Sequence, residues 1–257
     1  NLVCLIKNPL GNFSNKSQKI LKNILKKVSI ILVGCMLVMN VGCARKRSRA
    51  WIEEQILDIE KVYSTENLED LFEKFPNGFF IRQTRLKIGD NQNESYSYTM
   101  RLKGDKESKT IKGNIEKYKV KSEPYERTLI VNSNIEYIIG KGLVLDKPEL
   151  TEDLLPRNYF IFQKIKLNKE ILNNWELEEQ GYTSETGVFK VRYNAIDREI
   201  SKYFNIDEST ELNVRLGGVE LSEKNLYKYI LEVKNEKNNI NYYETLTNSK
   251  EDEKNEK

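Results

Sequence analysis

A short apolar run near the N-terminus does most to limit what this chain can fold into. Residues 28–42 form a stretch of 15 residues that is apolar apart from Ser29 and Asn40, and Lys26 and Lys27 precede it. A membrane-spanning helix needs about 20 apolar residues, whereas the apolar core of a signal peptide needs about 7–15 behind a basic segment. We therefore predict that residues 1–42 are a signal peptide that is removed. Because Asn1 is not a methionine, we expect the first ~15 residues to lie upstream of the true translation start.

A cysteine at the end of the apolar run indicates a lipoprotein signal peptide. The chain has three cysteines, Cys4, Cys35 and Cys43, and none follows. A bacterial lipoprotein signal ends in small residues and a cysteine, because the peptidase must reach the backbone there and the sulfur carries diacylglycerol. We predict Cys43 as the lipidated residue, since the full apolar run precedes its Val-Gly-Cys motif and a polar segment follows. Cys35, in Leu-Val-Gly-Cys, is the alternative; an uncleaved anchor and a buried hairpin of free cysteines are further ones.

A basic tether follows the predicted anchor. Residues 43–50 include Arg45, Lys46, Arg47 and Arg49. Two acyl chains on one cysteine make a durable membrane anchor, and each basic residue beside an anionic bilayer adds roughly 1 kcal/mol. We expect the tether to hold the protein close to the outer face of the cell membrane. The alternative is a solvated linker with no further role.

The hydrophobic pattern beyond the tether predicts a single α+β domain over residues 51–246. Residues 50–64 and 65–75 have helical spacing, and the period changes to alternation after Gly78. Strand-like segments follow at 79–89, 94–105, 109–120 and 125–138, and again at 188–195, 210–221, 225–235 and 240–247. We predict two N-terminal helices, then an antiparallel, curved sheet with a helix near 195–205 packed on it, and short helices within 151–177. Residues 247–257 should be a disordered charged tail.

Composition argues against most enzyme chemistry. The chain has no histidine, which removes the usual general base and the commonest metal ligand. It contains no Gly-x-Ser-x-Gly, Walker or Gly-x-Gly-x-x-Gly motif. Acid pairs such as Glu53/Glu54 and Glu178/Glu179 are typical of solvated surface, and Gly217-Gly218 fits a strand bulge better than a phosphate loop. We predict no catalytic residue, no metal site and no cofactor.

The charge balance bears on possible partners. The first 42 residues carry six lysines and no acid, so the rest, with the other 36 basic and all 39 acidic groups, has a net charge of −3. This argues against a general nucleic-acid binder. Lys117, Lys119 and Lys121 form a local basic strip at alternate positions that could still hold a polyanion.

Tyrosine is abundant in the predicted strands. Alternating tyrosines are ordinary in a half-buried sheet, and an exposed row of them could also grip a partner protein or a glycan. The most prominent ones are Tyr96, Tyr98, Tyr227, Tyr229, Tyr242 and Tyr243.

Several segments together resemble the staphylococcal tandem lipoproteins, a family of paralogous surface lipoproteins encoded in clusters. The resemblance spans roughly residues 20–248 and rests on the order of six short motifs: the lipobox at Cys43, Glu53 to Ile56, Asn67 to Leu71, Lys106 to Gly113, Lys202 to Ile206 and Asn239 to Leu246. Three segments depart from the family pattern: FEKFPNGFF, RLGGVEL and PRNYFIFQKIKL. The resemblance implies a lipid-anchored Gram-positive surface protein, and it carries over no catalytic residue.

Three functional classes follow from these observations. The first is a lipid-anchored surface protein with a non-catalytic binding role toward a host protein or glycan. The second is a solute-binding lipoprotein of a transporter, which usually has two α/β lobes and more than the 13 glycines found here. The third is a carboxylate-dependent cell-envelope hydrolase. We favour the first.

Overall fold

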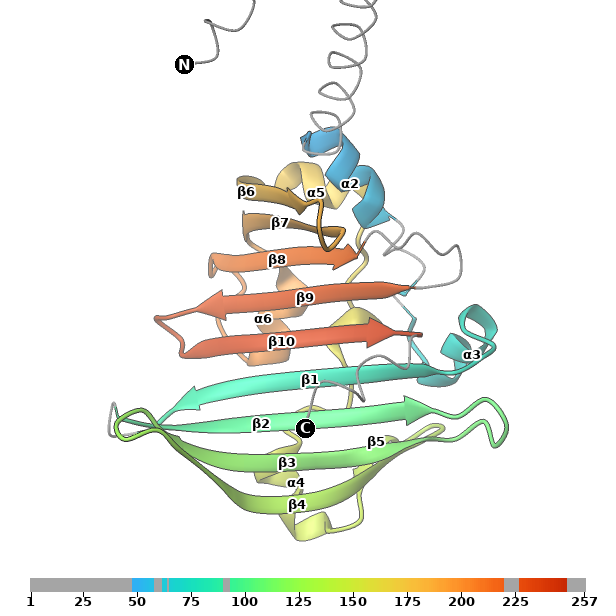
Figure 1. Ribbon diagram of the computed structural model, residues 1–257, viewed down its shortest axis with the longest axis vertical. Coiled ribbons are helices and arrows are strands. Elements are labelled where there is room, and N and C mark those ends of the chain that lie inside the picture. The colour runs from blue at the N-terminus through green and yellow to red at the C-terminus, as the bar shows by residue number, and fades with distance from the viewer. Residues whose placement is uncertain (1–47, 58–61, 64, 90–92, 220–226, 249–257) are drawn as a thin grey trace, which may run out of the picture. The chain divides into compact units, whose positions relative to one another are not determined.

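A computed structural model of the chain describes residues 48–57, 62–63, 65–89, 93–219 and 227–248 (Figure 1). The chain divides into two compact units after Ser48, and the unit that begins at Arg49 holds all the elements named below. The predicted signal peptide, Cys35, Cys43 and the tether up to Arg47 lie outside the described residues, as do residues 249–257 of the predicted tail.

One ten-stranded antiparallel sheet forms the framework, in the order β5-β4-β3-β2-β1-β10-β9-β8-β7-β6. The strands are β1 (Phe79–Ile88), β2 (Glu94–Gly104), β3 (Ile111–Lys121), β4 (Glu126–Ile138), β5 (Gly142–Leu145), β6 (Glu176–Thr183), β7 (Val188–Ala195), β8 (Leu212–Val219), β9 (Lys228–Asn235) and β10 (Ile240–Thr247).

The strand order joins two meanders at the centre of the sheet. β1 to β5 run outward to one edge, and β6 to β10 run from the opposite edge back to the middle, where β10 pairs with β1. The segment between β5 and β6 therefore has to cross from edge to edge. That crossover lies on one face and carries η3 (Pro148–Leu150), α4 (Thr151–Leu154), η4 (Ile161–Gln163) and α5 (Lys169–Asn174).

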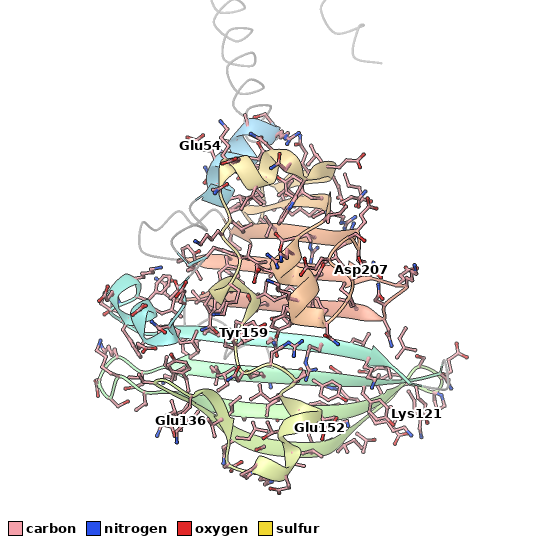
Figure 2. The ribbon with its side chains drawn as sticks, turned by 180° about the vertical axis from the view of Figure 1, so that it is seen from behind. Glu54, Lys121, Glu136, Glu152, Tyr159 and Asp207 are labelled. Atoms are coloured by element: carbon pink, nitrogen blue, oxygen red, sulfur yellow. The ribbon has the colours of Figure 1, made fainter. Side chains whose placement is uncertain are left out.

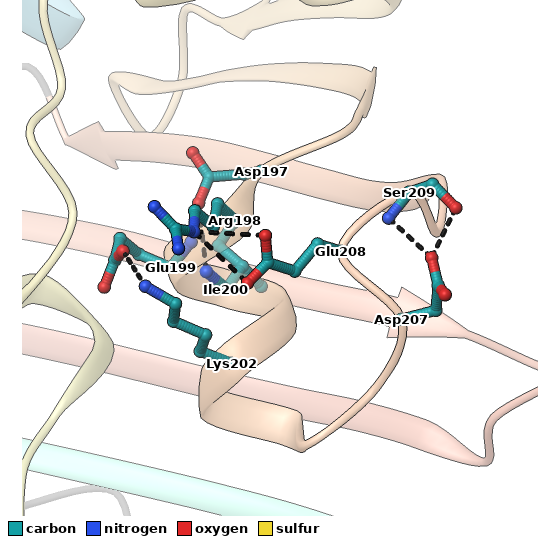
Figure 3. A network of polar contacts seen from close by, with 8 residues as sticks. All are labelled: Asp197, Arg198, Glu199, Ile200, Lys202, Asp207, Glu208 and Ser209. Atoms are coloured by element: carbon teal, nitrogen blue, oxygen red, sulfur yellow. Dashed lines mark hydrogen bonds and ion pairs between the residues drawn. The ribbon is translucent and has the colours of Figure 1, made fainter.

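The other helices are short. They are α2 (Arg49–Leu57), η2 (Leu68–Asp70), α3 (Leu71–Lys74) and α6 (Arg198–Phe204). Asp197 caps α6, because its carboxylate accepts hydrogen bonds from the amides of Glu199 (3.0 Å) and Ile200 (2.9 Å) (Figure 3). The helix ends at Asn205, which has a left-handed backbone with φ 56°.

The sheet has two unlike faces. Helices α4, α5 and α6 lie behind the strands in Figure 1 and in front of them in Figure 2, on what we call the helix face. Apolar residues at alternate strand positions point to this face, as with Tyr242 and Leu246 of β10 or Val214 and Leu216 of β8, all of which are fully buried. The opposite side, the open face, carries mostly polar and charged residues at the intervening positions.

The antiparallel sheet with a few helices, and the helix near 195–205, agree with the prediction from sequence. Two strands were missed. β5 is only four residues long, and β6 is an edge strand whose residues, Glu176–Thr183, are largely charged or polar. Part of the first predicted N-terminal helix, residues 58–61, lies outside the described residues. The full pair of N-terminal helices and the curvature of the sheet stay predictions.

Candidate functional site

A buried carboxylate lies at the centre of the sheet. Glu244 of β10 is fully buried, and each of its oxygens accepts two hydrogen bonds. Oε1 accepts from the hydroxyl of Tyr229 (3.0 Å) and the amide of Phe162 (3.2 Å). Oε2 accepts from the amide of Ile161 (3.1 Å) and from the hydroxyl of Tyr242. The carboxylate thus joins two central strands to the crossover segment.

Strand alternation puts this acid in the core. Ile240, Tyr242, Glu244 and Leu246 occupy every second position of β10, so Glu244 faces the same way as its apolar neighbours. Burial disfavours the charged form and raises the pKa of Glu244 to about 7, although the bonds from Tyr242, Tyr229 and the two amides work in the opposite direction.

A second layer of polar groups surrounds the carboxylate. Gln83 of β1 donates from Nε2 to the hydroxyls of Tyr203 (2.7 Å) and Tyr242 (3.1 Å). Tyr203 comes from α6, so this layer connects that helix to the two central strands. Burial holds the pKa of Tyr242 well above its usual value, so its hydroxyl stays protonated and acts as the donor to Glu244.

An outer group continues the polar path toward the surface. Arg85, two residues after Gln83, donates to the carbonyl of Leu154 (2.6 Å), and its guanidinium lies 4.6 Å from the centre of the Tyr98 ring. Burial lowers the pKa of Arg85. Asp153 of α4 accepts from the Tyr98 hydroxyl (3.2 Å) and from the ammonium of Lys117 (2.7 Å).

This buried cluster is suited to holding the structure together. Four donors already occupy the Glu244 carboxylate, so neither oxygen is free to take a proton from a substrate without breaking a bond to the protein. The donors come from β9, β10 and the crossover, and Gln83 extends the set to β1. We infer that the cluster fastens the crossover and α6 to the centre of the sheet.

The open face carries a different arrangement, a belt of shared ion pairs. Glu179 of β6 lies between Lys190 (2.7 Å) and Arg192 (2.8 Å) of β7. Glu232 of β9 lies between Arg215 of β8 (2.5 Å) and Lys234 (2.5 Å). The strand register places Arg192 directly opposite Arg215. The two triads therefore form one continuous row across four strands, which we call the arginine belt.

Most of the predicted anchor and tether residues, Cys43, Cys35, Arg45, Lys46 and Arg47, lie outside the described residues. Arg49, the last residue of the predicted tether, begins α2 and forms an ion pair with Glu53 one turn on (2.7 Å). The role of these residues in anchoring stays a prediction.

The predicted lysine strip lies on the helix face and is paired with acids. Lys117 pairs with Asp153 (2.7 Å), Lys119 with Glu94 (2.8 Å) and Lys121 with Glu126 (2.9 Å). Lys121 lies at the end of β3, well apart from Glu152 of α4 in Figure 2. Because each ammonium has a carboxylate partner, the strip is a weak candidate for holding a polyanion.

The tyrosines that stood out in the sequence do not form one row. Tyr229 and Tyr242 are fully buried against Glu244, and Tyr98 is buried beside Arg85. Tyr96 is partly buried, with the Lys117 ammonium 5.1 Å from its ring centre. Tyr243 alternates with Tyr242 and so faces the open side. The ordinary half-buried interpretation fits most of them.

Sequence analysis missed Glu244, Gln83 and Arg85. The signal for them is the phase of the alternation: Gln83 and Arg85 follow Phe79 and Ile81 at every second position. A charged or amide residue in the apolar phase of a strand marks a buried polar group. Gly217 and Gly218 lie within β8, where the register with β7 and β9 is continuous, so the strand bulge expected from sequence is absent at these two residues. A Cβ at Gly217 would come within 2.6 Å of the Phe189 carbonyl oxygen.

Within the described part of the chain, no cluster of three or more acidic, histidine or cysteine side chains is placed to hold a metal ion. No helix in the same residues is long and apolar enough to cross a membrane. Comparison with models of known protein families found no match, and comparison with curated proteins found none either.

Proposed function

We propose that this chain is a lipid-anchored cell-surface protein with a non-catalytic binding role, carried on the outer face of a Gram-positive membrane. Cys43 is the anchor, with Cys35 as the alternative, and Arg45, Lys46, Arg47 and Arg49 lie next to the bilayer. The apolar run with its lysine flank and the Val-Gly-Cys ending support the anchor. The resemblance to the staphylococcal tandem lipoproteins leads to the same proposal.

The observation that carries the binding role is the open face of the sheet. Helices α4, α5 and α6 lie on the helix face (Figure 2), so these three leave the open face uncovered. Ion pairs such as Arg101–Glu116 (2.8 Å) and those of the arginine belt hold the side chains of this face in place. A rigid polar surface on a continuous sheet favours contact with a host protein or glycan, because little side-chain freedom is lost on binding.

The two alternatives have less support. A solute-binding protein of a transporter needs a cleft between two lobes, whereas all strands in the described residues belong to one sheet. A carboxylate-dependent hydrolase needs an accessible acid pair. The most perturbed acid, Glu244, is fully buried and has four donors on its two oxygens.

The anchor is tested by substitution. We expect Cys43→Ser to abolish incorporation of labelled palmitate and to release the protein from the membrane fraction, because the sulfur that carries the lipid is lost. Cys35→Ser is the matched control and should leave both unchanged. Retained labelling in Cys43→Ser, with loss in Cys35→Ser, would transfer the anchor to Cys35; retained labelling in both would refute lipidation at either cysteine.

The binding role is tested by hydrogen exchange on the protein with a partner recovered from host extracts. We expect the bound partner to slow the exchange of backbone amides in the strands. We also expect it to protect open-face lysines such as Lys190 and Lys234 from chemical labelling. Protection confined to α4, α5 and α6 would contradict use of the open face. Turnover of a cell-wall glycan that is abolished by Glu244→Gln in a folded protein would favour the hydrolase instead.

A further inference from the structure

The two edges of the sheet are built differently. At one edge, β6 is largely charged or polar, and α2 lies beside it (Figure 1). Charged side chains or a covering helix commonly protect an edge strand, because its unpaired amides and carbonyls can otherwise pair with another strand. At the other edge, β5 covers β4 only over residues 135–138. Within the described part of the chain, residues 126–134 of β4 have no strand on their outer side.

This free edge carries exposed apolar residues at its middle. Leu129 and Ile130 have 49% and 48% of their surface exposed, and Val131 beside them is partly buried. An aliphatic, β-branched run without proline pairs readily as a strand. A β-bulge, at which Ile130 is the extra residue, interrupts the pairing of β4 with β3. A bulge can protect an edge by twisting it away, but this one leaves both side chains exposed.

Backbone hydrogen bonds show which residues of the edge point outward. The carbonyls of Asn132 (2.8 Å) and Asn134 (3.1 Å) accept bonds from the segment that follows β5, so both point away from β3. Backbone groups alternate between the two sides of a strand, and the bulge shifts that alternation by one residue. The backbone groups of Arg127, Leu129 and Ile130 therefore also point outward.

The edge is complementary to a second copy of itself. Antiparallel pairing with Leu129 opposite Ile130 of the other copy makes every outward residue meet an outward residue, and the two bulges then lie together at the two-fold axis. The resulting pairs, read in both directions, are Leu129–Ile130, Thr128–Val131, Arg127–Asn132 and Glu126–Ser133. Both charged residues of the run are opposite uncharged ones, so no like charges oppose each other across the junction.

The second copy also brings opposite charges together. The Arg127 guanidinium lies 3.8 Å from the centre of the Tyr118 ring, and among the described residues it has no carboxylate partner. Asp146 lies two positions along the edge from Asn132, the residue that faces Arg127 of the other copy. Symmetry repeats this approach of an arginine to an aspartate. Lys147 has to release the Asn132 carbonyl, which then accepts from the backbone of the other copy.

We propose that two copies of this chain pair antiparallel through residues 126–133 of β4, which joins their sheets into one. The two-fold axis is perpendicular to the sheet, because antiparallel neighbours in one sheet present the same face to the same side. The predicted tether leads into α2 at the far edge of each copy. Both tethers can therefore reach one membrane that faces one side of the joined sheet. This pairing goes beyond the proposed binding role and does not require it.

Cysteine cross-linking tests the pairing, because no cysteine follows Cys43. Leu129→Cys places a thiol beside the axis, about 6 Å from its own copy between Cα atoms, which is within the range of a disulfide. Tyr125→Cys is the matched control: Tyr125 is more exposed, at 73%, but lies about 30 Å from its own copy in this register. With mild oxidant, in the cell fraction that holds the full chain, we expect at least fivefold more covalent dimer from Leu129→Cys. The unsubstituted chain is the blank.

Two further experiments check the register and the cause. Arg127→Cys co-expressed with a differently tagged Asn132→Cys should form a mixed dimer at least fivefold more than either forms with itself, and this test stands even if Leu129→Cys fails to fold. Adding Ile130→Lys to Leu129→Cys sets two ammonium groups beside the axis and should reduce cross-linking at least fivefold. Ile130 is exposed, so the fold should persist, as checked by circular dichroism.

The outcomes separate self-pairing from its alternatives. Equal cross-linking in Leu129→Cys and Tyr125→Cys, or none in either, would overturn the proposal, as would undiminished cross-linking after Ile130→Lys. A disulfide from Leu129→Cys to a different protein would assign the edge to that partner and overturn self-pairing. None of these results bears on palmitate labelling of Cys43 or on protection of the open face, so the proposed function stands or falls separately.

Discussion

Replacing Glu244 by Gln tests whether the buried carboxyl controls the stability of the sheet centre. Gln has nearly the same shape but cannot ionise, and one of its two terminal atoms is a donor. The donors on one oxygen, either Tyr229 and Phe162 or Tyr242 and Ile161, must then face an amide NH₂. Each buried donor left without an acceptor costs about 1–3 kcal/mol. At pH 5 the folded-state carboxyl is protonated, but its hydroxyl oxygen can still accept a hydrogen bond, whereas an amide NH₂ cannot. The variant should therefore be less stable than the unsubstituted protein at this pH.

The difference in unfolding free energy between the two proteins depends on pH. The pKa of Glu244 is raised from 4.5 in the unfolded chain to about 7 in the folded one. Between these values the folded state holds a proton that the unfolded state has lost, so the stability due to this group is fully present below pH 4.5 and is lost as pH rises through 7. A shift of roughly two to three units at about 1.4 kcal/mol each amounts to about 3 kcal/mol. The advantage over Gln should shrink by about that amount between pH 5 and pH 8.

The measurement is urea unfolding of both proteins at several values between pH 5 and pH 8, followed by far-ultraviolet circular dichroism and extrapolated to water. Taking the difference between the two proteins removes the contribution of every group they share. Glu152→Gln removes an exposed acid on α4 (Figure 2) and is the matched control for loss of a surface carboxyl. A constant difference between the Glu244→Gln variant and the unsubstituted protein across this range would refute the reasoning.

Two further substitutions test the fold. Gly113→Ala in β3 should destabilise the protein by about 1–3 kcal/mol, because a Cβ there would lie 1.8 Å from the carbonyl oxygen of Arg101. An unchanged urea midpoint would show that β2 and β3 can move apart at no cost. Asp197→Ala should cost about 1 kcal/mol by removing the acceptor for the amides of Glu199 and Ile200, whereas Asp197→Asn should keep most of the stability, and equal loss in both would argue against the cap.

Local patterns in the sequence predicted most of the strands because alternation is a property of each strand alone. The segments 79–89 and 240–247, for example, correspond closely to β1 (Phe79–Ile88) and β10 (Ile240–Thr247). Gln83 and Glu244 occupy the same alternate positions as the buried apolar residues of their strands. A buried polar group could therefore have been predicted for each strand separately. It could not be predicted that the two belong to one cluster, since β1 and β10 are far apart in the chain.

The sequence by itself determined the charged and apolar phases of the strands and the breaks between them, and it predicts the N-terminal signal with its cysteines. Tertiary structure alone decided that β10 returns to pair with β1, which brings Gln83 directly opposite Glu244. It also decided that β7 and β8 pair with Arg192 opposite Arg215. The physical reason is the same in both cases. Strand pairing is selected by how well whole faces pack against the crossover and α6, and that is a sum over contacts between distant segments that no local pattern contains.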